Sequence, residues 1–506
     1  MKIFNDINNN LEKVKNKFKY DLTSDFIIRE LKVYYLNKEY NAFICFYDGM
    51  INKDHINHNI LAPLTTTQCS ILSEPNISLE KYIIENVLTA QNIKTSSDFN
   101  ELTYFLNIGY TAIFIDTLDV FLAVDTTSYE HRSVEKPVYE STIKGPQETF
   151  NEVMNTNRAL IRKCIQKENL IFEHIKIGRN ATNQAYLIYI EGITNMDIVK
   201  ELKRRIESID VDIVLTSETL EQYIENNTTS PIPQFLTTER PDRVASFLMD
   251  GRAVIMTNNS PNAIIAPTTI IDWFHSAEDG YLKFPFNYIL KIVRLISIVI
   301  ALLLPGLYIA TVTYHIDSFP TNLALTLSGS REEVPFQFII EMLIMELAFE
   351  LLREAEMRVP SRIGPIISIV GGLVLGQLAV MANIICPFTM IIVGFTGIAL
   401  YAIPNFYTAY GLRLIRYVFI LAAFINGFLG LALASFLFLV LIANTRSFNT
   451  ELLPSFYISK DENVIREIFS TPIFKREKRN YTNKSKNKNR QAKISRGWVL
   501  NDKQRH

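Results

Sequence analysis

The residues best placed for chemistry are five glutamates in the stretch EMLIMELAFELLREAEMRVP, which occupies positions 341–360 between two apolar runs. Charged side chains are costly in a bilayer unless they meet water or a partner, and in apolar surroundings they mark ion pathways or contacts between helices. We therefore take this acidic segment as the candidate functional centre. Its carboxylates are Glu341, Glu346, Glu350, Glu354 and Glu356.

If the segment is a helix, Glu346, Glu350, Arg353 and Glu354 lie along one stripe, because steps of three, four and seven residues return to nearly the same angle. Glu341 lies well off that stripe. The spacing lets Glu350 pair with Arg353. The other face is apolar, with Phe338, Ile340, Leu343, Ile344, Leu347 and Leu351.

Periodicity leaves three roles open for this helix. It could lie flat at the membrane interface, form an ion-coupling site in a transporter, or line an aqueous pore in an oligomer, where repeated carboxylates favour cations.

The next segment, IGPIISIVGGLVLGQLAVMA from position 363, is rich in small residues. Gly372 and Gly376 form a GxxxG pair, Ser368 lies on the same helical face and Gln377 is beside it. Such spacing lets helix backbones approach closely. The segment therefore packs tightly against another helix or presents a small, polar stripe to a pore.

These side chains need a membrane domain to position them, which the hydropathy pattern predicts over residues 285–445. A stretch of about 20 apolar residues spans a hydrocarbon core of about 30 Å. Pro305 and Gly306 interrupt the first such run. Candidate helices cover 292–314, 336–355, 363–383, 386–404 and 411–443.

Lysines and arginines place the loops near 283–294, 353–362 and 405–416 on the cytoplasmic side, and those near 315–335 and 383–387 outside. Five crossings would separate the two termini, whereas both are expected inside. A segment is therefore re-entrant, or the region from 417 onward turns back once more.

Outside this domain the chain predicts an α/β region of two subdomains, residues 1–133 and 134–284, because strand-like runs alternate with helical patterns. No apolar core of signal-peptide length opens the chain, so this region is expected in the cytoplasm. Residues 446–506 form a C-terminal segment with a short basic tail, expected near anionic lipid headgroups. The fold class is thus an α/β region followed by an all-α polytopic membrane domain.

No pattern of residues points to catalysis. The sequence has no Walker loop, no GxGxxG after a strand and no GxSxG. The four cysteines are widely spaced and the seven histidines show no metal-binding spacing. We therefore expect no enzyme activity, no catalytic or metal site, no cofactor and no nucleic-acid partner.

The segment from 334 to 380, VPFQFIIEMLIMELAFELLREAEMRVPSRIGPIISIVGGLVLGQLAV, strongly resembles the A subunit of GerA-type spore germinant receptors. Further matches are KGPQETFNEVMNTNRALIRK from 144, DRVASFLMDGRAVIM from 242, TYHIDSFPTNLALTLSGSREEVPF from 313 and GLRLIRYVFILAAF from 411. The resemblance covers residues 130–450 well. Residues 1–130 match more by layout than by motif.

The resemblance implies a receptor in the spore inner membrane, with its N-terminal domain and C-terminal tail on the core side. Its partners would be a transporter-like B subunit and a lipoprotein C subunit. Small nutrients trigger such receptors and release of monovalent cations follows. The resemblance also implies that the A subunit forms a homo-oligomeric, pentameric ion channel. Family motifs fall on Gly145, Pro146, Glu148, Arg353, Pro360 and Gly376.

Two features depart from the family. Gln147 stands where the family usually has arginine, and NTRSFNTELLPSF after the last span differs from the usual sequence. Our leading hypothesis is a nutrient-gated cation channel subunit, and the alternatives are a secondary transporter or a scaffold that does not conduct. For the channel, the expected ion pathway is Glu341, Glu346, Glu350, Ser368, Gly372, Leu375 and Gln377.

Overall fold

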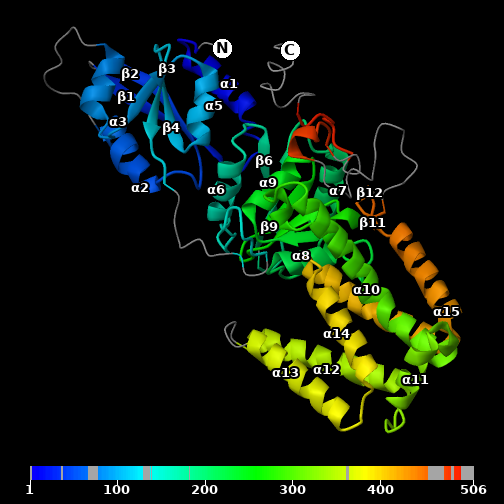
Figure 1. The fold of residues 1–506 in the computed structure, drawn as a ribbon. Helices are drawn as coiled ribbons and strands as arrows, with labels where there is room; N and C mark the ends of the chain where they lie inside the picture. The colour runs from blue at the N-terminus through cyan, green and yellow to red at the C-terminus, as the bar shows by residue number, and fades with distance from the viewer. Residues whose placement is uncertain are drawn as a thin grey trace, which may run out of the picture.

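The computed structural model describes residues 3–35, 38–66, 78–128, 137, 140–181, 183–359, 364–448, 450–453, 472–479 and 484–491, apart from the side chains of 364–370, 373 and 475. Figure 1 shows two α/β units in succession, followed by a bundle of long helices.

The first unit is an antiparallel sheet with helices on both faces. The strand order is β1 (Phe26–Tyr35), β2 (Lys38–Tyr47), β4 (Tyr110–Ile115), β5 (Phe121–Asp125) and β3 (Ile93–Ser96). One face packs on α1 (Ile7–Lys17) and α5 (Phe99–Asn107). The other packs on the short helices α2 (Lys53–Ile56), α3 (Ala62–Thr66) and α4 (Leu79–Tyr82), with π-helical turns at Asn57–Leu61 and Ile83–Val87.

The second unit repeats this topology. Its antiparallel sheet has the order β6 (Leu170–Ile177), β7 (Asn183–Ile190), β9 (Ala253–Thr257), β10 (Ala263–Ala266) and β8 (Leu236–Thr238). Helices α6 (Met154–Cys164) and α9 (Pro241–Met249) cover one face, and α7 (Met196–Glu207) and α8 (Ser217–Ile224) the other. The succession of helices and strands is the same in both units, so the α/β region is an internal structural repeat.

A buried ion pair joins the two units. Asp25 accepts a 2.9 Å hydrogen bond from Arg162 Nη2, and both side chains are buried. Burial acts to raise the pKa of Asp25, but the charge and hydrogen bonds of Arg162 outweigh it, so the pKa lies below its ordinary value. The Ser24 amide donates to the Phe172 carbonyl at 3.0 Å, which fixes the edge of the second sheet against the first unit.

The helical part follows the short 3-10 turns at Ile270–Phe274 and Ala277–Gly280. Its helices are α10 (Phe286–Tyr314), α11 (Thr321–Gly329), α12 (Phe338–Arg358), α13 (Gly364–Met381), α14 (Pro387–Tyr401) and α15 (Phe406–Asn444), with a 3-10 turn at Ile316–Ser318. Among the described helices, α10 and α15 are long and apolar enough to cross a membrane, and α14 is a shorter apolar helix.

Helix α15 reverses direction within its length. Asn426 and Gly427 have non-helical backbone angles, and Gly427 has φ +57°. The rings of Phe419 and Phe438 have centroids 6.1 Å apart, whereas nineteen residues of straight helix would separate them by about 28 Å. Residues 406–425 and 428–444 are therefore two arms packed side by side (Figure 1).

Both ends of the helical part meet the second α/β unit. A Cβ added at Gly411, in the first turns of α15, would overlap the carbonyl oxygen of Pro231. After α15, Ser447 Oγ donates to the Gln234 carbonyl at 2.8 Å, beside the small hairpin of β11 (Arg446–Ser447) and β12 (Thr450–Glu451). The chain therefore leaves this unit at α10 and returns to it after α15.

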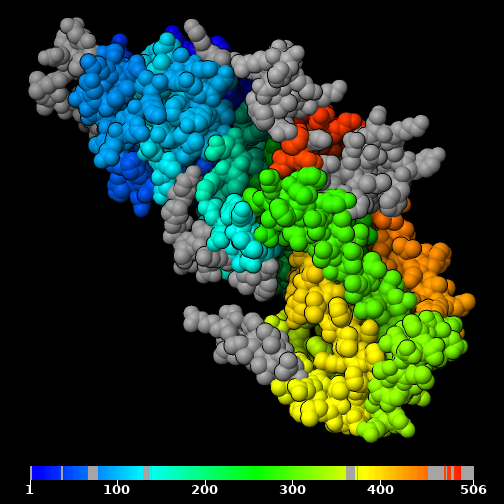
Figure 2. Space-filling model, in the orientation of Figure 1, coloured from blue at the N-terminus to red at the C-terminus, as the bar shows by residue number. Residues whose placement is uncertain are grey.

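The described part of the basic tail also lies on the second unit (Figure 2). It includes a 3-10 turn at Ile473–Lys475. Arg479 Nε donates to the Met249 carbonyl at 2.5 Å, and Arg490 pairs with Asp250 at 3.0 Å. These cations sit at the carboxyl end of α9, where the helix dipole favours positive charge.

The predicted fold class is confirmed: an α/β region with two sheets precedes a helical region with apolar, membrane-length helices.

Candidate functional site

Helix α12 carries the acidic segment and presents Glu341 to α14. It begins after Gln337, and its buried face includes Phe338, Met342 and Met345. Glu341 is also fully buried. Its Oε2 accepts from the Cys386 amide at 2.8 Å and from Thr389 Oγ1 at 3.2 Å, both at the start of α14. Because a helix amino terminus carries unpaired N–H groups and positive charge, this carboxylate fixes the start of α14.

Two ion pairs tie α12 to the first arm of α15. Arg416 donates to Glu346, and the two side chains are 3% and 2% exposed. One turn further along α12, Arg413 Nη1 lies 3.3 Å from Glu350 Oε1. Glu350 therefore pairs with Arg413 instead of the expected Arg353, because α15 brings a cation from another helix to the stripe.

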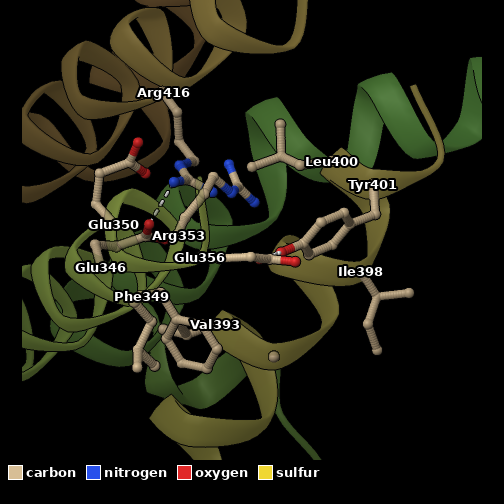
Figure 3. Close-up of a pocket in the computed structure, with 13 residues that line it drawn as sticks. Glu346, Phe349, Glu350, Arg353, Glu356, Val393, Ile398, Leu400, Tyr401 and Arg416 are labelled. Carbon is tan, nitrogen blue, oxygen red and sulfur yellow. Dashed lines mark hydrogen bonds and ion pairs between the residues drawn. The ribbon is translucent and has the colours of Figure 1, made fainter. Parts of the chain in front are cut away.

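The stripe borders a cavity of about 280 Å³ between α12 and α14. Figure 3 shows Glu346 and Glu350 on one side, Tyr401 and Ile398 on the other, and Arg353 between them. The lining residues are Glu346, Phe349, Glu350, Leu352, Arg353, Glu356, Val393, Gly394, Gly397, Ile398, Leu400, Tyr401 and Arg416.

Arg353 is the cation of this cavity that pairs with no carboxylate of the described chain. Its guanidinium carbon lies 4.9 Å from the centre of the Tyr401 ring, a cation–π contact. Its Nε and Nη1 are buried and donate to no described atom. Glu346 Oε1 and Arg416 Nε are likewise buried without a hydrogen-bond partner among the described residues. The remaining stripe glutamate, Glu354, pairs with Arg358 on the exposed side of α12.

Helix α13 packs through its glycines. A Cβ added at Gly376 would overlap the Met390 side chain of α14, and one added at Gly372 would touch the Phe349 ring at 3.8 Å. Leu375 and Gln377 are exposed in the single chain. Leu375 and Gln377 are two residues apart, which corresponds to a rotation of about 200° around the helix axis. The two side chains therefore point to different surroundings. The side chain of Ser368 and all of Pro360 lie outside the described residues.

The GPQE loop is held at the base of the helical part. Gly145 has φ +125°, and a Cβ there would come within 2.7 Å of the Tyr281 ring. The Pro146 carbonyl accepts from Arg240 Nη2 at 2.7 Å. Glu148 pairs with Lys163 at 2.6 Å. This loop is thus a structural contact, away from the acidic cavity.

The sequence reasoning missed the partners of the acidic stripe. Arg413 and Arg416 enter the sequence prediction only through the cytoplasmic loop at 405–416, although their spacing of three residues and the four-residue spacing of Glu346 and Glu350 each make about one helical turn. Gly394 and Gly397 were not singled out, and both face open space. Within the described part of the chain, no group of three or more His, Cys, Asp or Glu side chains could hold a metal ion.

Comparisons with known proteins give a consistent result. The model of the Bacillus/Clostridium GerA spore germination protein family matches residues 12–482. Spore germination protein KA of Bacillus subtilis is 36% identical over 95% of this chain and 89% of its own length. Spore germination protein GerLA of Bacillus cereus is 35% identical over 91% of this chain and 94% of its own length.

The solved structure of the N-terminal domain of the A subunit of the Bacillus megaterium spore germinant receptor GerK3 is also similar. Its sequence is 29% identical, the comparison covers 53% of this chain and 96% of that domain, and the TM-score is 0.41.

Proposed function

From the finding that this chain belongs to the GerA family of spore germination proteins, we propose that it is a germinant receptor A subunit that forms an oligomeric cation channel in the spore inner membrane. The observation that carries the proposal is the family match over nearly the whole chain, joined to apolar helices of membrane length beside an acidic helix. The role is that of a receptor and conduit rather than a catalyst.

The proposed membrane topology has six passes. The chain crosses through α10, α12, α13, α14 and the two arms of α15. Six is an even number of crossings, so both termini lie on the same side of the membrane, as the sequence analysis expects. In support, the chain returns to the second α/β unit at Ser447, and Arg479 and Arg490 of the tail bind that unit. The α/β region and the tail then face the spore core.

Within the ion pathway, we assign different parts to the candidate carboxylates. Glu350 is 40% exposed and is placed to meet cations. Glu341 and Glu346 are buried and hydrogen-bonded to α14 and α15, so they hold α12 in position. A carboxylate at the pathway attracts monovalent cations and repels anions.

Helix α13 supplies the narrow part of the proposed pathway. Leu375 is 47% exposed and is available to face the axis of an oligomer, which we propose is a pentamer. Ser368 and Gly372 share its side of the helix, whereas Gln377 points elsewhere and would meet a neighbouring copy or the B subunit. The C lipoprotein would complete the receptor, and membrane lipid would surround its outer helices.

A second candidate function, a scaffold that does not conduct, is favoured by one observation. Glu341, Glu346 and Glu350 all have partners within the chain, as expected for side chains that only join helices.

The discriminating experiment is potassium efflux from proteoliposomes that contain the purified full chain. A channel gives efflux that falls in Leu375→Trp, because an exposed position accepts a larger side chain without disturbing the single chain. The control is Leu378→Trp, which is 56% exposed on the same helix and lies about 80° away from Ser368 and about 60° away from Leu375. Absence of efflux from well-incorporated wild-type protein would favour the scaffold.

A further inference from the structure

We propose that the cavity between α12 and α14 is a binding site for a small organic carboxylate with an apolar body, anchored by Arg353. The proposal goes beyond ion conduction, because it gives this subunit a ligand site of its own.

Arg353 has two donors without a hydrogen-bond partner among the described residues. Buried polar groups are nearly always hydrogen-bonded, and a buried charged donor without a partner is costly. Arg353 Nε and Nη1 are buried at the cavity and donate to no described atom. The Tyr401 ring covers one face of the guanidinium. It accepts no hydrogen bond from the N–H groups, which point outward in the plane of the guanidinium. An oxygen anion in the cavity would satisfy these donors after the half-exposed Arg353 side chain turns toward it.

The cavity wall also contains an ion pair with unsatisfied polar atoms. Glu346 and Arg416 pair with each other and are 2% and 3% exposed, yet Glu346 Oε1 and Arg416 Nε have no hydrogen-bond partner among the described residues. Because these atoms have almost no solvent-accessible surface, a polar head in the cavity reaches them only after the Glu346 side chain rotates. Figure 3 shows Arg353 between this pair and Tyr401.

The charged side chains around the cavity restrict the charge of the ligand. Arg353 attracts an anion, but Glu346 and Glu350 also border the cavity and repel a second negative charge. A monocarboxylate fits this balance better than a phosphate dianion. An additional ammonium group on the ligand is compatible, since Glu350 is partly exposed toward the cavity.

The cavity also has space for the apolar body of the ligand. Phe349, Leu352 and Val393 line the cavity. Gly394 and Gly397 of α14 also line it, and a Cβ added at either would meet nothing within 4 Å. Glycine inside a helix costs about 1 kcal/mol relative to alanine, and no contact in the described chain requires it here. At about 30 Å³ per water, 280 Å³ holds roughly nine non-hydrogen atoms.

The test uses 4-methylpentanoate as the probe, with the full chain in phosphatidylcholine nanodiscs and binding measured by equilibrium dialysis against empty nanodiscs. We expect saturable binding that L-leucine competes for and that the neutral 4-methylpentan-1-ol does not. Binding that is not saturable, or equal competition by the alcohol, would overturn the proposal, because the carboxylate would then play no part.

Three variants locate the site. Arg353→Gln should weaken binding roughly tenfold to hundredfold, the effect of losing hydrogen bonds to a charged group. Gly397→Leu, which fills the cavity from a position with open space, should weaken it at least tenfold. The matched control Arg358→Gln removes a cation from the exposed side of α12, where it pairs with Glu354, and should bind as wild type.

Two further outcomes decide against the proposal. If both cavity variants fold with wild-type circular dichroism and bind the probe normally, the cavity holds only water. If phosphatidylglycerol in the nanodisc displaces the probe from wild type, the occupant is a lipid headgroup. Neither measurement depends on ion flux. A chain that binds the probe but does not conduct ions would therefore refute the channel proposal and still support this binding site.

Discussion

Removing Arg416 should strongly destabilise the helical part, because Glu346 would remain buried without its cation. The Glu346 and Arg416 side chains are 2% and 3% exposed, so solvent cannot replace the lost partner. Breaking a buried ion pair from one side costs about 3–5 kcal/mol. We therefore expect Arg416→Met to lower the free energy of unfolding by about that amount.

The double variant separates the ion pair from simple packing. Glu346→Met combined with Arg416→Met removes both charges and keeps apolar volume, and such replacements are often neutral or stabilising. The double variant should therefore regain most of the free energy lost in the single one. Arg358→Met is the matched control, because its exposed pair with Glu354 is worth about 0.3–0.5 kcal/mol.

The assay is denaturant unfolding of the detergent-purified full chain, followed by far-UV circular dichroism and combined into a double-mutant cycle. An Arg416→Met variant within about 1 kcal/mol of wild type would refute the reasoning. A double variant whose loss equals the sum of the single losses would do so as well, since the two side chains would then be independent.

Two predictions concern other contacts. Gly411→Ala places a Cβ against the Pro231 carbonyl and should lower the free energy of unfolding by about 1–3 kcal/mol. The control Gly394→Ala places its Cβ in open space and should cost nothing. Equal shifts in the thermal unfolding midpoint of the two variants would contradict this. Burial and the neighbouring Glu225 raise the pKa of Glu221 from 4.5 to about 8, so the folded state holds a proton that the unfolded chain has lost. The free energy of unfolding should therefore fall as the pH rises from about 4.5 to 8. Glu221→Gln should reduce that fall in urea unfolding curves measured across this pH range. An unchanged pH dependence in the variant would show that the Glu221 carboxyl is not responsible.

The fold class could be predicted from the sequence because it depends on local patterns. Strand-like runs such as NAFICFY and QAYLIYI became β2 and β7, and the charge-free runs became long helices. The shared strand order of the two sheets could not be predicted, because it depends on pairing between distant strands. The reversal of α15 at Asn426 and Gly427 was foreseen only as one of two options, since an NG pair inside an apolar run does not fix a turn.

The candidate site was predicted in its residue types but not in its partners. Periodicity placed Glu346, Glu350 and Arg353 on one face of α12, and those three do border one cavity. It could not show that α15 supplies Arg413 and Arg416, because spacing within a helix carries no information about the helix opposite. Whether Glu350, Gly372 and Leu375 conduct ions stays a prediction, since an ion pathway through an oligomer involves surfaces that one chain leaves exposed.

The most direct test of the central claim is the reversal potential of currents from the purified full chain in a planar bilayer with a potassium chloride gradient. We expect discrete currents that reverse near the potassium equilibrium potential, with cation selectivity that weakens in Glu350→Gln. Absence of currents from correctly assembled protein, or reversal near the chloride potential, would contradict it.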